Sequence, residues 1–457
     1  GLAWDPFGKG KTSIRAGFGM AYDVIFDNVG STAYPPQLSS TYDAGNFPNI
    51  FKQPFLANGG IAPGSLSGGG DLNQVDARQA TSSYLPDQML PYSIQWNFGV
   101  QHVFHNDYTL EARYLGTRGV HLLVQDRLNM INKVTPDRHL PTYLTTPGQA
   151  QLDALTWTLP QIQGFSNYDP RYSSAGFDGA AIVGFMPWGN STYNGMALQM
   201  TRRFAHGFQM VGAYTWSHNI DDSTATHFST LLTPRRPQDF ANLRADRSSS
   251  ALDRRQRFTA SWVWETPWMS RSDNWFAKNL AGNWRFVGSY TAETGELATV
   301  QSGTDTNMNG DSAADRAIVN PAGDANRGSG VSALKNSAGA TVAYLALDPT
   351  ARYITAAAGA RSNGGRNTLQ MPGINNFDLS LGKKLNLAEN RSVEFRADLG
   401  NAFNHPQYTA GYTNSIRLTQ QTTNRTFLLP SNSQFANWPG NFPSNARTMQ
   451  LGLRFVF

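Results

Sequence analysis

The sequence predicts an all-β protein, an antiparallel transmembrane β-barrel with short periplasmic turns and long extracellular loops. Segments in which apolar and polar residues alternate recur about ten times, as expected of strands with one apolar and one polar face. The connections between these segments alternate between short and long, and the chain ends on an alternating segment that closes on an aromatic residue. These three observations favour a barrel wall of about ten strands over a soluble sandwich, whose connections are usually short throughout.

The composition supports strands rather than helices. Of the 457 residues, 12% are aromatic, 15% are charged and 43 are Gly, so strand and turn formers are abundant. The chain contains no Cys, which excludes a disulfide framework and thiol catalysis. No run of about 18 apolar residues occurs, which excludes a transmembrane helix, whereas a mean hydropathy of −0.41 is compatible with a barrel. The net charge of +5, on scattered basic residues, gives little support to nucleic-acid binding.

The first half of the chain contains one isolated strand pattern and two hairpin patterns. In the first segment Ile14, Phe18 and Met20 fall on one face and Arg15 falls on the other. Short polar turns at residues 105–107 and 205–207 join the members of each hairpin. The expected strands are residues 12–22, 90–104, 108–118, 194–204 and 208–217.

The second half continues the alternation. Residues 391–403 have the clearest pattern, with Val393 and Phe395 opposite Glu394 and Arg396, and a short turn at residues 388–390 precedes them. Residues 280–300 are expected to form one long strand. The expected strands of this half are residues 257–266, 280–300, 376–385, 391–403 and 446–457.

Four residues near the end of the chain predict an assembly signal. They share one apolar face and finish on an aromatic side chain, as in the final strand of bacterial outer-membrane barrels: Leu451, Leu453, Phe455 and Phe457. The alternative is an ordinary half-buried strand that finishes a soluble domain. If the chain end is periplasmic, every short turn is periplasmic and every long loop is extracellular, as in transmembrane β-barrels. This alternation of short and long connections predicts that the protein is located in the outer membrane of a Gram-negative bacterium.

Five phrases occur in order along the chain: GLAWDPFGKGKTSIRAGFGMAYD, RRFAHGFQMVGAYTWSHNIDD, DRRQRFTASWVWETP, NAFNHPQY and LGLRFVF. Together they resemble the barrel half of TonB-dependent transporters of the Oar-like type, which have a carboxypeptidase-regulatory-like N-terminal domain. The resemblance implies a barrel of about 22 strands closed around a plug. It makes residues 1–457 the C-terminal portion of that barrel, with the signal peptide, N-terminal domain, plug and first strands absent from this chain.

The resemblance also implies partners and a function. The expected partners are outer-membrane lipid, a TonB-type energy-coupling protein acting through the missing plug, and the barrel-assembly machinery acting through the C-terminal strand. The expected function is active uptake of a large or scarce nutrient such as an oligosaccharide, peptide or chelate. The alternatives are a passive outer-membrane porin and a secreted carbohydrate-binding β-protein. No catalytic activity is expected, since the sequence contains no HExxH or GxSxG motif.

Alternation assigns a set of charged side chains to the lumen, where they would form the wall against plug and cargo: Glu111, Arg113, Glu394, Arg396 and Asp398. A second charged set precedes and enters the strand at residues 257–266. Its functional interpretation is a vestibule surface for anionic or polar cargo, and its structural interpretation is a network of compensating pairs that anchors a loop or the plug. This set comprises Asp246, Arg247, Asp253, Arg254, Arg255 and Arg257.

One loop motif resembles the first half of a calcium loop. Oxygen-bearing side chains occur at every second residue before a Gly: Asp305, Asn307, Asn309 and Asp311. Such side chains can converge on a hard cation, although Arg316 replaces the acidic residue expected at the twelfth position. The alternative is an Asn/Asp-rich surface turn. Structural calcium is the only cofactor that the sequence suggests. Aromatic loop residues could stack on sugars or peptides or could pack within the loops: Tyr34, Tyr42, Phe47, Phe51, Tyr168, Tyr172 and Trp438.

Overall fold

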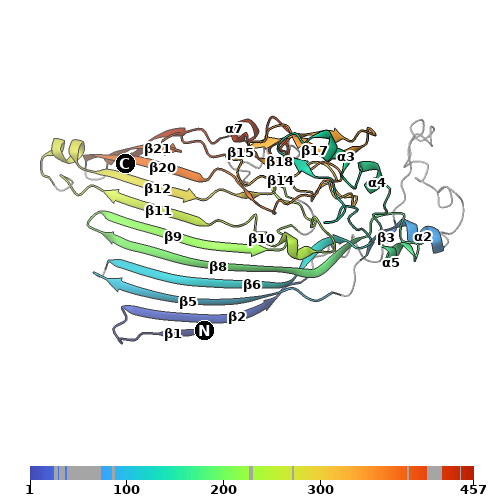
Figure 1. Cartoon of the computed structure of the whole chain (residues 1–457). Coiled ribbons are helices and arrows are strands. Elements are labelled where there is room, and N and C mark those ends of the chain that lie inside the picture. Colours follow the sequence, from blue (N-terminus) through green and yellow to red (C-terminus); the bar gives the residue numbers. More distant parts are fainter. Residues whose placement is uncertain are drawn as a thin grey trace, which may run out of the picture.

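A computed structural model describes residues 1–24, 29, 37–38, 74–84, 88–105, 107–225, 230–269, 272–388, 391–408, 425–442 and 444–457. It contains one 14-stranded sheet, which confirms the predicted all-β, antiparallel fold class. The main path of this sheet follows chain order, so each strand pairs with the next one along the path (Figure 1). The path is β1 (Leu2–Trp4), β2 (Thr12–Tyr22), β5 (Tyr92–Phe104), β6 (Tyr108–Arg127), β8 (Val183–Ala205), β9 (Phe208–Asp221), β11 (Gln256–Glu265), β12 (Trp284–Glu293), β20 (Ile374–Ala388), β21 (Arg391–Gly400) and β22 (Thr448–Val456).

Short turns join the strands at one end of the sheet. Between β8 and β9, Ala205 pairs with Phe208, and both residues of the two-residue turn have positive φ, 50° at His206 and 78° at Gly207. This is the conformation of a type I′ turn, whose twist matches that of the flanking strands. The turns expected at residues 105–107 and 388–390 include Asn106, Glu389 and Asn390, which lie outside the described residues.

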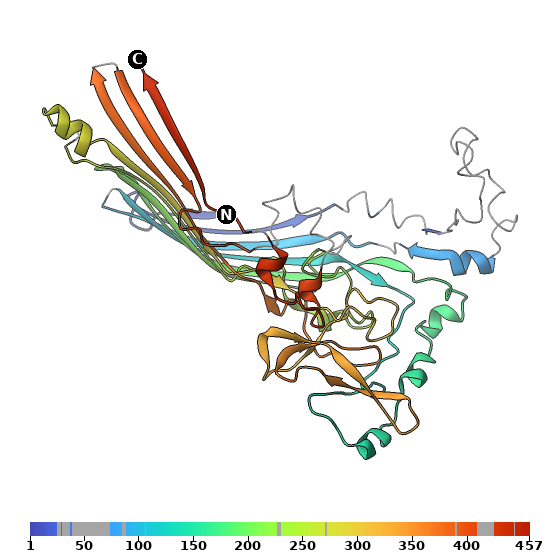
Figure 2. The ribbon, with the colours of Figure 1, turned by 90° about the horizontal axis from the view of Figure 1, so that it is seen from above.

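The long connections all leave from the opposite end of the sheet (Figure 1). Much of the described length of four of them, those after β6, β9, β12 and β21, folds into a second layer that projects from the sheet (Figure 2). We call the described residues 128–182, 222–225, 230–255, 294–373 and 425–442 the loop module. Its elements are β7 (Thr142–Tyr143), α3 (Gln149–Asp153), α4 (Leu159–Gln163), α5 (Pro170–Ser173), η2 (Leu243–Asp246), β10 (Ser248–Ser249), β13 (Leu297–Ala298), β14 (Ile318–Val319), β15 (Asp324–Ser329), β16 (Val331–Lys335), β17 (Thr341–Ala346), β18 (Ala351–Ile354), β19 (Leu369–Gln370), η5 (Thr426–Leu428) and α7 (Trp438–Asn441).

Besides η3 (Ala277–Ala281), which connects β11 and β12, three further elements lie outside this module. They are β3 (Gln37–Leu38), α2 (Gln74–Ala80) and β4 (Thr81–Tyr84), all within the connection between β2 and β5. β4 pairs in parallel with the start of β8, through Ser83 and Val183. Among the described residues, no helix combines the length and the apolar character needed to span a membrane.

Three predicted strands have wrong boundaries. Residues 280–300 do not form one strand: Ala277–Ala281 is a π-helical turn, β12 ends at Glu293, and Leu297–Ala298 pairs with β19 inside the loop module. The strand predicted at residues 108–118 extends to Arg127, and the strand predicted at residues 194–204 begins at Val183. The register of β6 against β8 shifts between Gly119 and Leu122 and again before Val124, so alternation fails there although pairing continues.

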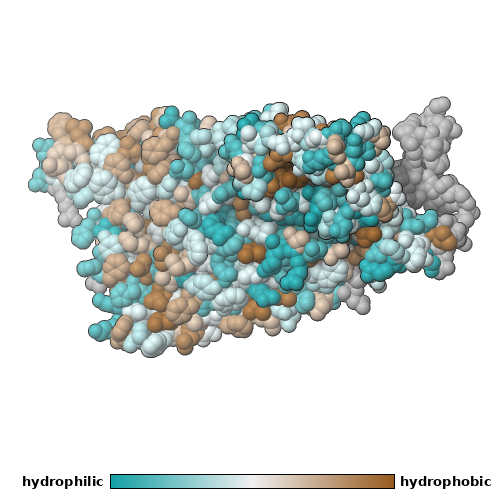
Figure 3. Space-filling model, viewed as in Figure 1, coloured by the Kyte–Doolittle hydropathy of each residue, from teal (hydrophilic) through white to brown (hydrophobic). Residues whose placement is uncertain are grey.

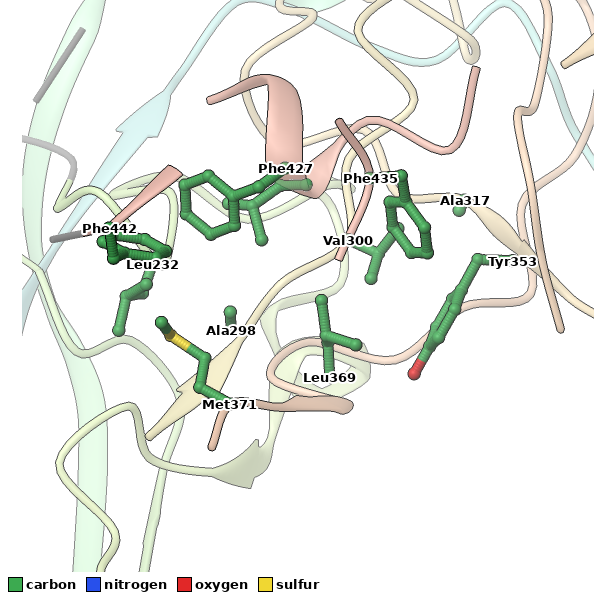
Figure 4. Packing of buried hydrophobic residues seen from close by; sticks show 11 residues of the cluster. Leu232, Ala298, Val300, Ala317, Tyr353, Leu369, Met371, Phe427, Phe435 and Phe442 are labelled. Carbon is green, nitrogen blue, oxygen red and sulfur yellow. The ribbon is translucent and has the colours of Figure 1, made fainter. Parts of the chain in front are cut away.

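The buried apolar residues gather in the loop module. Its largest cluster brings Phe427 and Phe435 against Val300, Leu369 and Met371 (Figure 4). A second cluster surrounds Leu140 and Ile162, which are fully buried. Because each cluster joins segments that are far apart in the sequence, the described segments of the loop module form one packed body.

The sheet, by contrast, leaves large apolar side chains exposed. Phe18 on β2 is 76% exposed and Phe455 on β22 is 62% exposed. Hydrophobic residues are frequent over the strand half in Figure 3, whereas hydrophilic residues are frequent over the loop module. An apolar surface of this extent needs a covering, and around a sheet of this kind that covering is lipid.

Candidate functional site: the polar face and the loop module

Cross-strand register gives the sheet one polar and one apolar face, because paired residues share a face. Ser13 on β2 pairs with Gln101, Gln101 with Glu111, and Glu111 with Gln199, which makes a continuous polar row over four strands. The next residue of each strand forms the apolar row Ile14, Val100, Ala112 and Leu198. We call the side of the first row the polar face and the side of the second row the apolar face.

The apolar face carries the residues of the predicted assembly signal. Leu451 pairs with Ala397, which pairs with Leu381, and Leu381 pairs with Phe286. Leu451, Leu453 and Phe455 are all more than half exposed on this face. The chain end therefore contributes to the surface that would contact lipid.

Glycine shapes the apolar face where tryptophan crosses a neighbouring strand. Trp262 on β11 pairs with Gly288 on β12, and a Cβ at Gly288 would lie 2.2 Å from the Trp262 ring. Trp96 has the same relation to Gly116, at 2.1 Å. Each indole occupies the space that a side chain would fill, so these glycines are required by the aromatic beside them.

Two of the residues predicted to face the lumen lie together on the polar face near the short-turn end. Glu111 and Arg113 are 3.4 Å apart. Arg15 and Arg113 both pair with Gly99, one from each neighbouring strand. Because Gly99 has no side chain, none stands between the two arginines at this position. A shallow hollow here is lined by Ser13, Arg15, Asn97, Gln101, Glu111 and Arg113.

The other three predicted lumen residues lie on β21, also on one face. The Arg396 Nε donates to the Asp398 carboxylate at 2.7 Å. Glu394 lies between cations on both neighbouring strands, 3.7 Å from Lys384 and 3.9 Å from Arg454. These pairs are exposed and contribute little to stability individually. Together with Glu111 and Arg113, they show that the face is polar both among the first strands of the sheet and among its last strands.

The predicted charge cluster does not form one patch. Five of its six members instead interact through their side chains with a residue from another segment, and those partners lie at the ends of strands or in the loop module. Arg247 contacts Asp222 at 3.0 Å, and Arg254 contacts both Glu293 at 2.8 Å and Glu296 at 2.6 Å.

Of the remaining members, only Arg255 pairs within its own segment, with Asp253. Asp246 accepts from Arg316 at 2.5 Å, and both side chains are buried. Asp253 accepts from the Asn219 backbone N–H at 2.7 Å and lies 3.4 Å from Arg255. Arg257 contacts Glu293 at 3.3 Å. Arg254 and Asp253 therefore tie the loop module to the ends of β12 and β9. The Asp246–Arg316 and Arg247–Asp222 pairs instead join segments of the module to one another, and Arg257–Glu293 joins two strands.

Two buried ion pairs in this network were not predicted. Arg236 contacts Asp311 through two nitrogens, one of them Nη2 at 2.8 Å, and also donates from Nη1 to Gln125 at 2.9 Å. Arg366 pairs with Asp221 at the end of β9. The partners are separated by 75 and 145 residues, so no local pattern could have indicated them.

These ties place the module on the polar face. Glu293 pairs with Arg257, which pairs with Thr215, and that register continues through Ala197 to Arg113. The Glu293 side chain therefore belongs to the polar face. Asp221 lies six residues beyond Thr215 on β9, so it points the same way. Arg254 and Arg366 thus bind the loop module to the lumen side of the wall.

The calcium-like motif is organised by hydrogen bonds within the loop. Asp305 accepts from the backbone N–H groups of Asn309 at 3.1 Å and Gly310 at 2.8 Å. Asn307 and Asn309 each accept from the N–H two residues on. Burial opposes ionisation of Asp311, but hydrogen bonds and charge from Arg236 hold its pKa below the usual value.

Guanidinium groups surround this loop, and their positive charge balances part of the negative charge of its carboxylates. Arg127 donates to the Gly310 carbonyl and lies 4.0 Å from the Asp311 carboxylate. Within the described ranges, no three His, Cys, Asp or Glu side chains form a metal-binding group. Calcium binding by Asp305, Asn307, Asn309 and Asp311 stays a prediction.

Asp315 is an acidic residue that the sequence did not single out. It is fully buried, and its Oδ2 accepts from the Thr306 N–H at 2.7 Å, while its Oδ1 has no hydrogen-bond partner. Burial raises the pKa of Asp315 to about 8, and the nearby Asp305 charge acts in the same direction. The side chain is therefore mainly protonated at neutral pH.

The aromatic loop residues have separate environments. Trp438 packs on Phe427 and Phe442, with ring centroids 6.0 Å and 6.4 Å away, so it belongs to the module core. Tyr168 forms a β-bridge with Met130, and Tyr172 lies in α5. The other predicted aromatic residues lie outside the described residues: Tyr34, Tyr42, Phe47 and Phe51.

A family model described as an outer membrane beta barrel domain matches residues 1–450. The chain therefore belongs to this family of outer-membrane β-barrel domains. This confirms the predicted location in the outer membrane of a Gram-negative bacterium, where lipid surrounds the barrel wall. No curated protein matches the sequence.

Solved structures that match this chain include outer-membrane transporters and receptors. The outer membrane transporter YddB from Escherichia coli is 8% identical, with a TM-score of 0.38 over 99% of this chain and 39% of its own. The siderophore receptor PiuA from Acinetobacter baumannii is 9% identical, with a TM-score of 0.40 over 100% of this chain and 35% of its own. The copper transporter OprC is 9% identical, with a TM-score of 0.36 over 98% and 38%. This chain spans less than two fifths of the length of these three proteins.

Proposed function

We propose that this chain is the C-terminal portion of the barrel of an Oar-like TonB-dependent transporter. The five sequence phrases support this family type. The open sheet supports a larger barrel, because β1 and β22 are its two edges and do not pair with each other within the described part of the chain. An unpaired edge in lipid costs several kcal/mol per backbone group, which favours completion by further strands.

The transporter takes up a large or scarce nutrient such as an oligosaccharide, peptide or chelate. The observation that carries this proposal is the attachment of the loop module to the polar face by Arg254–Glu293 and Arg366–Asp221. A packed body over the lumen side restricts free diffusion and offers a large surface for ligand capture. A TonB-type protein supplies the energy through the plug, and the barrel-assembly machinery receives the C-terminal strand.

Two measurements test this proposal. The reading frame upstream of the Gly1 codon should encode a plug and about twelve further strands. Uptake of the cognate nutrient by the intact protein should stop when the TonB-type protein is deleted or the proton gradient is collapsed. A start codon preceded only by a signal peptide, together with energy-independent uptake, would establish the porin alternative instead. That alternative has the same polar face but requires an open lumen.

A further inference from the structure

The connection between β11 and β12 exposes large apolar side chains at the short-turn end of the sheet. Turns in this position are usually polar, because they lie in water. Here the π-helical turn η3 (Ala277–Ala281) and its surroundings expose Trp275 by 48%, Phe276 by 66% and Leu280 by 67%. Trp268, Met269 and Leu387 nearby are also more than half exposed. We call these six residues the turn platform.

The platform is fixed to the sheet by specific hydrogen bonds. Asn279 is almost fully buried, accepts from the Asn386 backbone N–H at 2.7 Å and donates to its carbonyl at 3.2 Å. The Trp275 indole donates to the same carbonyl at 3.1 Å. The apolar side chains are therefore held on an ordered turn, and their exposure is a property of the fold.

Contacts with β12 and β20 place the turn beside the apolar face. Trp284 and Lys383 are cross-strand partners in a row that continues to Phe395 and Leu453, both apolar-face residues. The Trp284 indole donates to the Leu280 carbonyl at 3.2 Å, and the Lys383 ammonium donates to the same carbonyl at 3.0 Å. The ammonium thus neutralises the carbonyl end of the turn, which explains a lysine on this face.

Aromatic contacts make the platform continuous with the strand surface. Trp268 packs edge-to-face on Trp264, with ring centroids 5.3 Å apart, and Trp264 stacks on Phe286 at 5.3 Å. Phe286 in turn stacks on Trp284 at 6.4 Å. This chain of rings runs from the apolar face of β11 and β12 to the turn. The platform therefore borders the surface that lipid covers.

We propose that the turn platform is an interfacial anchor that binds the lipid headgroup and upper acyl-chain region. The short-turn side of such barrels is periplasmic, so the lipid is the phospholipid of the inner leaflet of the outer membrane. Trp275, Phe276 and Leu280 enter the interface, where tryptophan and other large apolar residues are favoured. Lys278, three residues before the end of the turn, supplies a cation that would pair with lipid phosphate. This proposal does not depend on the transported nutrient.

Site-specific fluorescence tests the anchor in the full-length protein, reconstituted in phosphatidylethanolamine and phosphatidylglycerol vesicles. This chain has no Cys, so F276C and L280C each provide one labelling site for bimane once any other cysteines of the full-length protein are replaced. D273C, at an exposed position of the same connection, is the matched control. Folding of each variant is checked by heat-modifiable gel mobility.

We expect labels at positions 276 and 280 to be quenched by brominated acyl chains and to be at least about fivefold less sensitive to aqueous iodide than the label at position 273. Equal iodide quenching at all three positions would show that the platform lies in water and would overturn the proposal. Protection from iodide without quenching by brominated lipid would also overturn it, because a protein surface would then cover the platform.

Discussion

Arg366 donates to both the backbone carbonyl and the carboxylate of Asp221, a residue 145 positions earlier in the chain. The carbonyl contact is 2.6 Å, and both side chains are buried. Arg366 also donates to the Asp246 carbonyl at 2.9 Å. One guanidinium thus joins the end of β9 to two segments of the loop module, and this connection keeps the module on the lumen side of the wall.

The substitution R366M should release this attachment. It leaves the buried Asp221 carboxylate without its cation, which costs about 3–5 kcal/mol. We expect faster limited proteolysis within the loop module and a lower unfolding temperature, with the strands still folded. The control is R327M, which removes an exposed pair with Asp348 at 2.8 Å and should cost no more than about 1 kcal/mol. Equal sensitivity of the two variants would contradict the role given to Arg366.

The substitution D315N should remove a pH-dependent loss of stability in the loop module. The pKa of Asp315 is about 8 in the folded chain against 3.8 ordinarily, so the folded state binds the proton more tightly. The free energy of unfolding therefore falls as pH rises from about 4 to about 8 and is level beyond. At pH 7 the upper limit of this loss is about 4 kcal/mol, at roughly 1.4 kcal/mol per pH unit.

Thermal unfolding of wild type and D315N at pH 5, 6, 7 and 8 measures this effect. The difference in unfolding temperature should widen in favour of the variant as pH increases. If the unfolding temperatures of wild type and D315N changed with pH in parallel, Asp315 would titrate normally and would not be buried in solution.

The substitution G288A should displace Trp262 on the apolar face. The added methyl group would lie 2.2 Å from the indole, so either the ring or the strand must move, at a cost of about 1–3 kcal/mol. G212A is the control, because a Cβ at Gly212 meets nothing within 4 Å. Urea unfolding and tryptophan emission should change for G288A and remain near wild type for G212A. An unchanged emission spectrum in G288A would refute the packing of Trp262 over Gly288.

A charge on neighbouring residues of β22 should distinguish its two faces. L451R places a cation on the apolar face and should cost about 2–4 kcal/mol near the middle of the bilayer. Q450R places the same cation on the polar face, beside Asp398, and should be tolerated. The folded fraction on heat-modifiable gels measures the difference. Similar folding of both variants would remove the assignment of the apolar face to lipid.

The strands and their faces could be predicted from the sequence. Residues 12–22 alternate without interruption, and the structure has β2 at the same residues. The two-residue turn at His206 and Gly207 was also visible, since it is short, polar and contains the Gly that positive φ favours. Both features are local: a strand has a period of two residues and a hairpin turn has a fixed length.

Features that break the local period could not be predicted. The register shifts after Gly119 interrupt the alternation that would have shown the extension of β6. The π-helical turn at Ala277–Ala281 occupies the start of the segment expected as one strand at residues 280–300. Both are stabilised by partners elsewhere, the first by β8 and the second by Asn386.

An antiparallel wall with one polar and one apolar face follows from the order of residues alone, because side-chain alternation depends only on backbone geometry. The sequence also showed that charged residues lie where the long connections meet the strands. Which of these charges pair depends on how the segments pack in three dimensions. Arg316 reaches Asp246 and Arg366 reaches Asp221 because the long connections fold together around Phe427 and Leu369, and that packing brings distant segments within hydrogen-bond distance.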